Sequence, residues 1–255
     1  MKIRVLGASG SEDPGMNSPA FLVDEFFLLD AGTVCLSLDR AAQRRISHVF
    51  ISHAHLDHIK GIPSLVDNVV FVDPSWQLHI LSGYEIIADL QNNIFNDRIW
   101  PDFTLLPSSA TPVLRYQEIK NGEPFHVGGY SITATPVNHA VPAYGYLVSN
   151  ASSEAFLYTG DTGPTDAIWE RTAGHRVKLL IVEVSFPNEL EHLALASGHL
   201  TPLLLGRELA KMPAIPERIF VTHLKPFHRD AIAAQLRQLS GFSVRILDDE
   251  NELSI

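Results

Sequence analysis

Short apolar runs recur along the whole chain, and clusters of turn-forming residues separate them. Alternation of apolar and polar positions predicts strands, whereas apolar positions spaced three or four apart predict helices. We expect strands at 3–7, 20–24, 26–30, 48–52, 69–73, 114–119, 130–135, 144–149, 154–159, 178–183, 218–222 and 243–247. We expect helices at about 34–44, 59–67, 83–95, 164–173, 201–211 and 228–239. Strands in both halves with helices between them favour two sheets packed face to face and covered by helices outside.

No internal repeat, low-complexity tract or flexible linker marks a boundary, so we expect one domain covering 1–255. No run approaches the roughly 20 apolar residues of a membrane span. The strand-like KIRVLG follows Met1 directly, without the basic start and apolar core of a signal peptide. The single cysteine, Cys35, excludes an internal disulfide. We therefore expect a cytoplasmic protein with no membrane partner.

The formal net charge of −10 bears on the class of partner. Affinity for a polyphosphate comes mainly from clustered Lys and Arg, so this charge argues against a general nucleic-acid binder. It is also unfavourable for a small anionic substrate unless bound cations reverse the local sign.

Ligand-type side chains are concentrated in one turn, ISHAHLDHIKGIP at 51–63. His53 and His55 are two positions apart at the end of an apolar strand, and alternation sends both to the same side. Asp57 and His58 follow on the turn into the next helix, which brings them back over the first pair. Imidazole and carboxylate groups together suit zinc, and also manganese or iron. Four such groups within six positions predict a metal site.

Further ligand-type residues stand at the ends of later strands. His139 follows YSITATPV, Asp161 follows AFLY, and His223 follows RIFV. Ligands scattered at strand ends converge on one rim when the strands share a sheet or two stacked sheets. We expect these three side chains to complete the site begun by the early histidines.

This pattern, HxHxDH followed by a lone His, a Gly-Asp-Thr and a late Thr-His, resembles the metallo-β-lactamase superfamily over essentially the whole chain. The resemblance implies an α/β (α+β) fold, a four-layer αββα sandwich with a metal site between its sheet edges. It also implies that His53, His55 and His139 hold one metal, and that Asp57, His58 and His223 hold the other. Asp161 would bridge the two ions, and all seven positions are filled.

Longer strings within the chain are similar to the class II 3′,5′-cyclic-nucleotide phosphodiesterases. These are HLDHIKG at 55–61, IFNDRIWPDF at 94–103, EVSFPNE at 183–189, SGHLTP at 197–202 and THLKP at 222–226. Pro63 departs from that family, which usually has an aliphatic residue there, and we expect it to bend the first turn of the helix. The resemblance implies a small-molecule partner, cyclic AMP and/or cyclic GMP, and a homodimer as a family-level expectation.

The implied chemistry uses two divalent ions, zinc first, with manganese or iron as alternatives. Two ions roughly 3.5–4 Å apart hold a hydroxide that attacks phosphorus. The ribose 3′ oxygen would leave, giving a 5′-nucleotide. Two ions supply +4 and Asp57 and Asp161 supply −2, which leaves a centre of +2 before the hydroxide binds and removes the objection from the bulk charge.

The leaving oxygen needs a proton, and the sequence offers several donors. His199 in SGHLTP is the first candidate for this catalytic role or for gripping the phosphate, and Asp57 or a metal-bound water are its rivals. His199 has an alternative role, in which it orients a metal ligand from behind. The sequence leaves both open.

Other functions share the metal pattern. One is a tRNA 3′-processing nuclease, although its basic, glycine-rich arm is missing here. A lactone or thioester hydrolase would leave the strings at 94–103, 183–189 and 197–202 unexplained. The non-enzymatic alternative is a metal protein that binds a nucleotide without turnover. Absence of one of the expected metal-ligating residues would favour it, and all of them are present.

Overall fold

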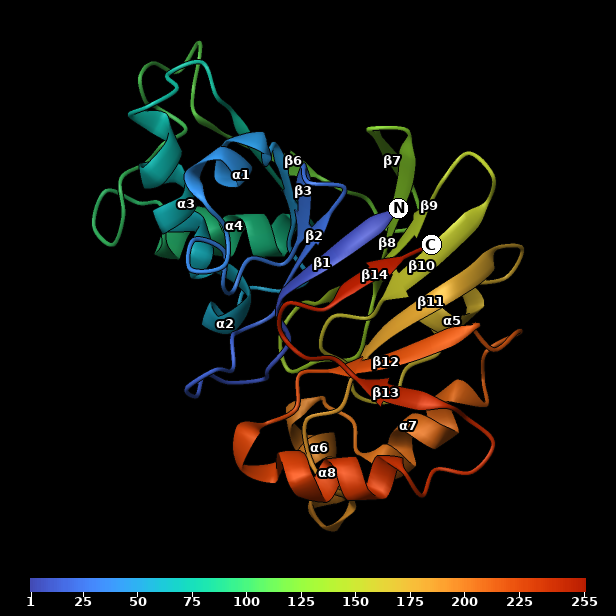
Figure 1. Cartoon of the computed structure of the whole chain (residues 1–255). Helices are drawn as coiled ribbons and strands as arrows, with labels where there is room; N and C mark the ends of the chain where they lie inside the picture. Colours follow the sequence, from blue (N-terminus) through green and yellow to red (C-terminus); the bar gives the residue numbers. More distant parts are fainter.

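The computed structural model describes all 255 residues and contains two sheets of seven strands each (Figure 1). The first sheet has the order β14-β1-β2-β3-β4-β5-β6. Its strands are β1 (Lys2–Gly7), β2 (Ala20–Val23), β3 (Phe27–Leu29), β4 (His48–Phe50), β5 (Leu78–Ser82), β6 (Leu114–Glu118) and β14 (Glu252–Ser254).

The second sheet has the order β13-β12-β11-β10-β9-β8-β7. Its strands are β7 (Pro124–Val127), β8 (Tyr130–Pro136), β9 (Tyr144–Ser149), β10 (Glu154–Tyr158), β11 (Arg176–Glu183), β12 (Arg218–Thr222) and β13 (Val244–Ile246). Each half of the chain thus supplies nearly all of one sheet, and only β14 crosses from the end of the chain to the first sheet.

Helices cover the outer face of each sheet (Figure 1). Against the first sheet lie α1 (Arg40–Arg45), α3 (Gly61–Val70) and α4 (Tyr84–Asn93), and the short α2 (Leu56–Ile59) follows β4. Against the second lie α5 (Ala167–Glu170), α6 (Glu191–Ser197), α7 (Pro202–Leu209) and α8 (Arg229–Leu236), with 3₁₀ turns η1 (Asn188–Leu190) and η2 (Pro226–His228). None of these helices combines the length and apolar character needed to span a bilayer.

Three apolar cores separate these layers. The middle core joins the inner faces of the two sheets and is rich in aromatic rings, among them Phe21, Phe50 and Tyr158. One outer core packs α1, α3 and α4 on the first sheet, and the other packs α5 to α8 on the second. The order helix, sheet, sheet, helix confirms the four-layer αββα sandwich.

The structure corrects several sequence-based element predictions. The strand expected at 69–73 is wrong, because this run ends α3, which buries Ile62, Leu65, Val66 and Val69 at helical spacing and leaves Phe71 exposed. The helix expected at 34–44 begins only at Arg40, where the side chain of Asp39 accepts the N–H of Ala42. The pattern missed β5, β7, β14 and α6 altogether.

Strand direction determines where the functional side chains gather. β3 and β4 are parallel neighbours, and so are β10, β11 and β12. β8 is antiparallel to β9, and β9 is antiparallel to β10, so β8 runs in the same direction as β10. The carboxyl ends of parallel strands lie at one edge of a sheet, so residues that follow these strands meet at a common rim.

Two histidines outside that rim stack on each other. His48 and His79 are register partners on β4 and β5, with ring centroids 5.0 Å apart and an interplanar angle of 16°. Burial, and then the neighbouring His79, lowers the pKa of His48 to about 4, and burial followed by Arg115 lowers the pKa of His79. Protonation of either ring is therefore disfavoured in the folded protein.

We predict that this pair makes the fold acid-sensitive. An unfolded histidine has a pKa of about 6.5, so the unfolded chain takes up protons first and stability falls as the pH drops from about 6.5 towards 4. The variant His48→Phe keeps a stacking ring without the titration, and its urea midpoint should fall less between pH 7.5 and pH 5 than that of the wild type. Equal losses in the two proteins, at matched metal content, would contradict the prediction.

Candidate metal centre

The early histidine turn begins where β4 ends. Ser52 donates its backbone N–H to Asp30 Oδ1 over 2.7 Å, which fixes the chain as it leaves the sheet. His55 then occupies the N-cap of α2, and Asp57 and His58 lie on its first turn. The tight turn places His53 Nε2 only 2.9 Å from His55 Nδ1, so the two rings face a common point.

The later ligand-type residues reach the same place from the second sheet. His139 follows β8, Asp161 follows β10 and His223 follows β12. His139 Nε2 lies 3.4 Å from His55 Nδ1, and His223 Nε2 lies 3.3 Å from His58 Nε2. All seven side chains that the sequence singled out as ligands are thus brought together at the rim between the sheets.

The seven groups form two overlapping sets. The ligand atoms of His53, His55 and His139 lie within 4.8 Å of one another, and so do those of Asp57, His58 and His223.

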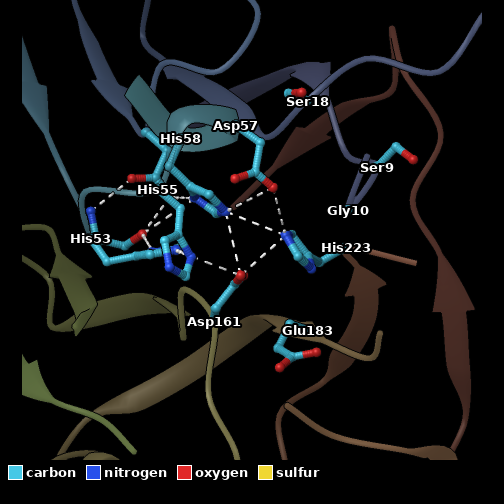
Figure 2. A network of polar contacts seen from close by, with 12 residues as sticks. Ser9, Gly10, Ser18, His53, His55, Asp57, His58, Asp161, Glu183 and His223 are labelled. Carbon is cyan, nitrogen blue, oxygen red and sulfur yellow. Dashed lines mark hydrogen bonds and ion pairs between the residues drawn. The ribbon is translucent and has the colours of Figure 1, made fainter. Parts of the chain in front are cut away.

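Asp161 lies between the two sets. Its Oδ2 is 3.1 Å from His223 Nε2, 3.5 Å from His58 Nε2 and 3.7 Å from His53 Nε2. Figure 2 shows the carboxylates of Asp57 and Asp161 facing the His58 and His223 rings from opposite sides.

The donor set fits divalent cations. Ligands in a tetrahedral shell about 2.0–2.1 Å from zinc lie about 3.3 Å apart, and the inner contacts of 2.9 to 3.7 Å cluster around that value. Five imidazoles and two carboxylates are also the ligands that zinc, manganese and iron accept. The residues therefore fit two ions, and the donor chemistry does not choose among these metals.

The outer nitrogens of four of the five rings are held by protein partners. His58 Nδ1 donates to Asp30 Oδ2 (2.7 Å), and His139 Nδ1 donates to the backbone oxygen of Gly198 (2.8 Å). His53 Nδ1 faces the hydroxyl of Ser52, and His223 Nδ1 faces that of Ser185. Carboxylate and carbonyl oxygens only accept, and Ser52 and Ser185 donate their own protons to Asp30 and Glu183, so these bonds place a proton on Nδ1 and direct Nε2, the nitrogen that would bind a metal, towards the cluster.

Asp30 is the functional residue that sequence reasoning missed. It is fully buried after β3, and it accepts hydrogen bonds from the N–H and hydroxyl of Ser52, from Tyr158 and from His58. It thereby orients one ring of the cluster directly and a second, His53, through Ser52. The available signal was the one that flagged the others, a carboxylate directly after an apolar strand.

His199 lies beside the cluster rather than within the set of seven. It is 7% exposed, and its Nδ1 is 2.8 Å from Glu183 Oε1, a carboxylate at the end of β11. Its ring stacks on His223 with centroids 5.4 Å apart. The sequence gave Glu183 no role, although it belongs to the string EVSFPNE.

The backbone at the rim is unusual in two places. Asp30 (φ 56°) and His223 (φ 65°) both adopt the left-handed backbone conformation that residues other than glycine rarely take. Gly10 passes so close to His223 that a Cβ there would lie 2.3 Å from its carbonyl oxygen, so only glycine fits (Figure 2). The chain thus accepts local strain to place these two side chains.

Burial and charge act together on the titrating groups. Burial would raise the pKa of Asp161, but His223 and His58 hold it well below its usual range. Burial opposes protonation of His58, yet Asp161 and Asp30 raise its pKa well above normal. Burial, reinforced by His58, lowers the pKa of His53. The centre therefore keeps its carboxylates ionised and charges its imidazoles unequally.

The fold and this buried cluster define a metal-dependent hydrolase of the metallo-β-lactamase fold. The family model for the "Beta-lactamase superfamily domain" matches residues 25–224, and the chain belongs to that family.

Comparisons with individual proteins show which relatives the chain resembles. The chain is 27% identical to a Yersinia pestis protein described as "Probable 3′,5′-cyclic-nucleotide phosphodiesterase", over 96% of this chain and 86% of that one. It is 23% identical to ribonuclease Z of Archaeoglobus fulgidus, over 90% and 89% of the two chains. Among solved structures, unliganded yeast PDE1 superposes with a TM-score of 0.85 at 19% identity, covering 100% of this chain and 99% of that one.

We predict that Asp30→Asn weakens metal binding without unfolding the protein. The amide presents an N–H to donors that the carboxylate had accepted, so His58 loses its orienting partner. Loss of such an outer partner typically costs about 10- to 100-fold in metal affinity. Chelator competition with zinc measures the change. Asp24→Asn, on the neighbouring turn and also at positive φ (43°), is the matched control, and equal affinities in the two variants would contradict the prediction.

Proposed function

We propose that this protein is a dinuclear-metal phosphodiesterase that hydrolyses 3′,5′-cyclic nucleotides, cyclic AMP and/or cyclic GMP, to 5′-nucleotides. The observation that carries the proposal is the buried Asp161 shared between two ligand sets. Such a two-ion arrangement suits in-line displacement at a phosphodiester. The likeness to a protein described as a cyclic-nucleotide phosphodiesterase supports this choice of substrate.

The residues assigned to metal binding are those that meet at the rim. His53, His55 and His139 would hold one ion, Asp57, His58 and His223 the other, and Asp161 would contact both. When bound, divalent ions supply Lewis acidity towards phosphoryl oxygens and lower the pKa of coordinated water.

The charge of the pocket and the exposure of its carboxylates bear on how an anionic substrate approaches. Two carboxylates, Asp57 and Asp161, contribute −2, and two divalent ions would contribute +4, so the loaded pocket would be positive within a protein of net charge −10. Asp57 is the more accessible of the two, with 29% of its side chain exposed against 3% for Asp161. An anionic substrate therefore approaches past Asp57.

His199 is the proposed proton donor to the leaving ribose oxygen. Glu183 holds its Nδ1, and the Glu183 side chain is fully buried and also accepts the backbone N–H of Thr162 and of Leu200. The carboxylate is thus fixed by several donors and in turn fixes the imidazole. A ligand atom of His199 lies within 4.8 Å of those of His139 and Asp161, which places the ring at the centre.

A ribonuclease Z-like activity is the second candidate, because the chain is similar to the Archaeoglobus enzyme over most of its length. Net charge weighs against it, since a tRNA meets the protein through many phosphates. A lactone or thioester hydrolase and a nucleotide-binding protein without turnover remain as outcomes of the substrate test below.

We predict that purified protein with two equivalents of zinc or manganese converts cyclic AMP or cyclic GMP into the 5′-nucleotide. Asp161→Asn keeps the shape of the side chain but removes the shared charge, so turnover should fall at least about a hundredfold. Circular dichroism should show an intact fold, and Asp166→Asn, at an exposed position, should behave as the wild type.

A panel on the same metal-analysed sample decides between the candidates. Cleavage of precursor tRNA or bis(p-nitrophenyl) phosphate without turnover of either cyclic nucleotide would contradict the substrate assignment while leaving the metal chemistry intact. Binding of two ions with no hydrolysis of any ester would contradict the enzymatic proposal altogether.

A second prediction separates proton donation by His199 from mere positioning. p-Nitrophenolate leaves without a proton, whereas a ribose alkoxide needs one. His199→Gln should therefore lower kcat for the cyclic nucleotide roughly a hundredfold or more and lower it much less for bis(p-nitrophenyl) phosphate. His192→Gln, exposed on α6, is the control. Equal losses on the two substrates, or loss of metal from His199→Gln, would leave His199 as a positioning residue only.

A further inference from the structure

A hollow of about 450 Å³ opens between the loop after β1 and the segment that joins β12 to α8. Its lining includes Glu12 and Asp13 from the first segment and Lys225, Phe227 and His228 from the second. In Figure 1 these are the blue loop below β1 and the orange segment beside it. Nothing in the reaction described above uses this hollow.

Both walls of the hollow are anchored to the metal centre. Ser9 pairs with Leu224 in a short parallel bridge, and Gly10 packs directly against His223. Lys225 Nζ donates to the backbone oxygen of Gly10 and ties the two segments together. The spacing of the walls is therefore set by the same backbone that positions His223.

A line of aromatic rings leads from the centre into the hollow. The ring of Phe186 lies 5.8 Å from that of His199 and 6.2 Å from that of His228. The ring of Phe227 in turn lies 5.2 Å from that of His228. Phe227 follows His223 by four residues, so their Cα atoms are at most about 14 Å apart.

Phe227 itself is 94% exposed, the most exposed of the large apolar residues. A single exposed phenylalanine is ordinary on a protein surface, and Phe71 is 82% exposed at the end of α3. What distinguishes Phe227 is its position in a hollow whose walls are anchored beside His223 of the metal centre.

We propose that this hollow is the nucleobase subsite and that the base stacks on Phe227. The inference rests on the proposed phosphodiesterase function. With the phosphate at the metal centre, the ribose carries the base outward into the hollow, where every base offers a π-face to an aromatic ring. Glu12 Oε1 pairs with Lys60 Nζ, and the carboxylate of Asp13 in the lining only accepts hydrogen bonds, so Asp13 suits the amino or imino N–H groups of a base.

A second hollow flanks the centre on the opposite side, along the segment that contains His139 and Tyr144. Apart from His139, its one aromatic ring is that of Tyr144, which packs against Gly83, where an added Cβ would lie 2.4 Å from a ring atom. The segment also carries mainly apolar groups such as Val137 and Val141. Its tyrosine ring is thus partly covered and Glu85 is its single carboxylate, whereas the ring of Phe227 is 94% exposed.

The test compares a cyclic nucleotide with a cyclic phosphate that has no base, the 3′,5′-cyclic phosphate of 1-deoxyribose, with ring opening followed by ³¹P NMR. Phe227→Ala should lower the ratio of the two kcat/KM values about tenfold, which corresponds to about 1.4 kcal/mol and is the size expected for one stacked base. Phe227→Trp should keep the ratio within about twofold of the wild type. Phe71→Ala is the matched control and should leave it unchanged.

The outcomes are distinguishable. A wild-type protein inert towards both compounds would contradict the proposed function. A wild-type protein active on both, with the same ratio in Phe227→Ala, would overturn the subsite alone. An unchanged ratio together with a change of oligomeric state in Phe227→Ala, measured by light scattering, would also overturn it and assign the exposed ring to an interface between copies.

Discussion

The structure at the rim depends on one electrostatic constraint, the burial of the Asp161 carboxylate, which is 2% exposed, among three imidazoles. A buried carboxylate is costly unless cationic or hydrogen-bonding partners surround it. Here those partners come from both sheets, because His53 and His58 follow β4 while His223 follows β12. The two sheets must therefore stack with their strand ends in register at this point, and the middle core of aromatic residues holds them there.

Each sheet supports its own part of the cluster with the same combination of groups. In the first sheet the hydroxyl of Ser52 donates to the buried Asp30 and faces His53 Nδ1. In the second, the hydroxyl of Ser185 donates to the buried Glu183 and faces His223 Nδ1. Each carboxylate also holds a second ring directly, His58 or His199. These contacts lie within one sheet, and the hydroxyl of Tyr158 on β10 adds a donor to Asp30 from the other sheet.

Sequence reasoning predicted the parts of this arrangement that local patterns along the chain encode. The early turn was predictable because four ligand-type groups stand within six positions, and strand-end position singled out His139, Asp161 and His223. The αββα layering followed from the distribution of strands and from the family resemblance. The apolar run at 69–73 misled because periodicity over five residues does not separate a strand from the last turn of a helix such as α3. The place of Asp30 after an apolar strand was visible, but its pairing with Ser52 was not, because that contact spans 22 positions and no local pattern encodes it.

Strands and loops contribute different parts of the rim. The ligand-type groups follow strands whose directions and register are fixed by the sheets, so they tolerate little change. The hollow that contains Phe227 is instead built from the loop after β1 and the turn η2, and its residues Glu12, Asp13 and Phe227 belong to none of the three cores. Similarity to both a cyclic-nucleotide phosphodiesterase and a ribonuclease Z is what such a division produces. Under the proposed function, the chemistry at phosphorus would belong to the strand ends, and the choice among phosphodiesters to the loops beside them.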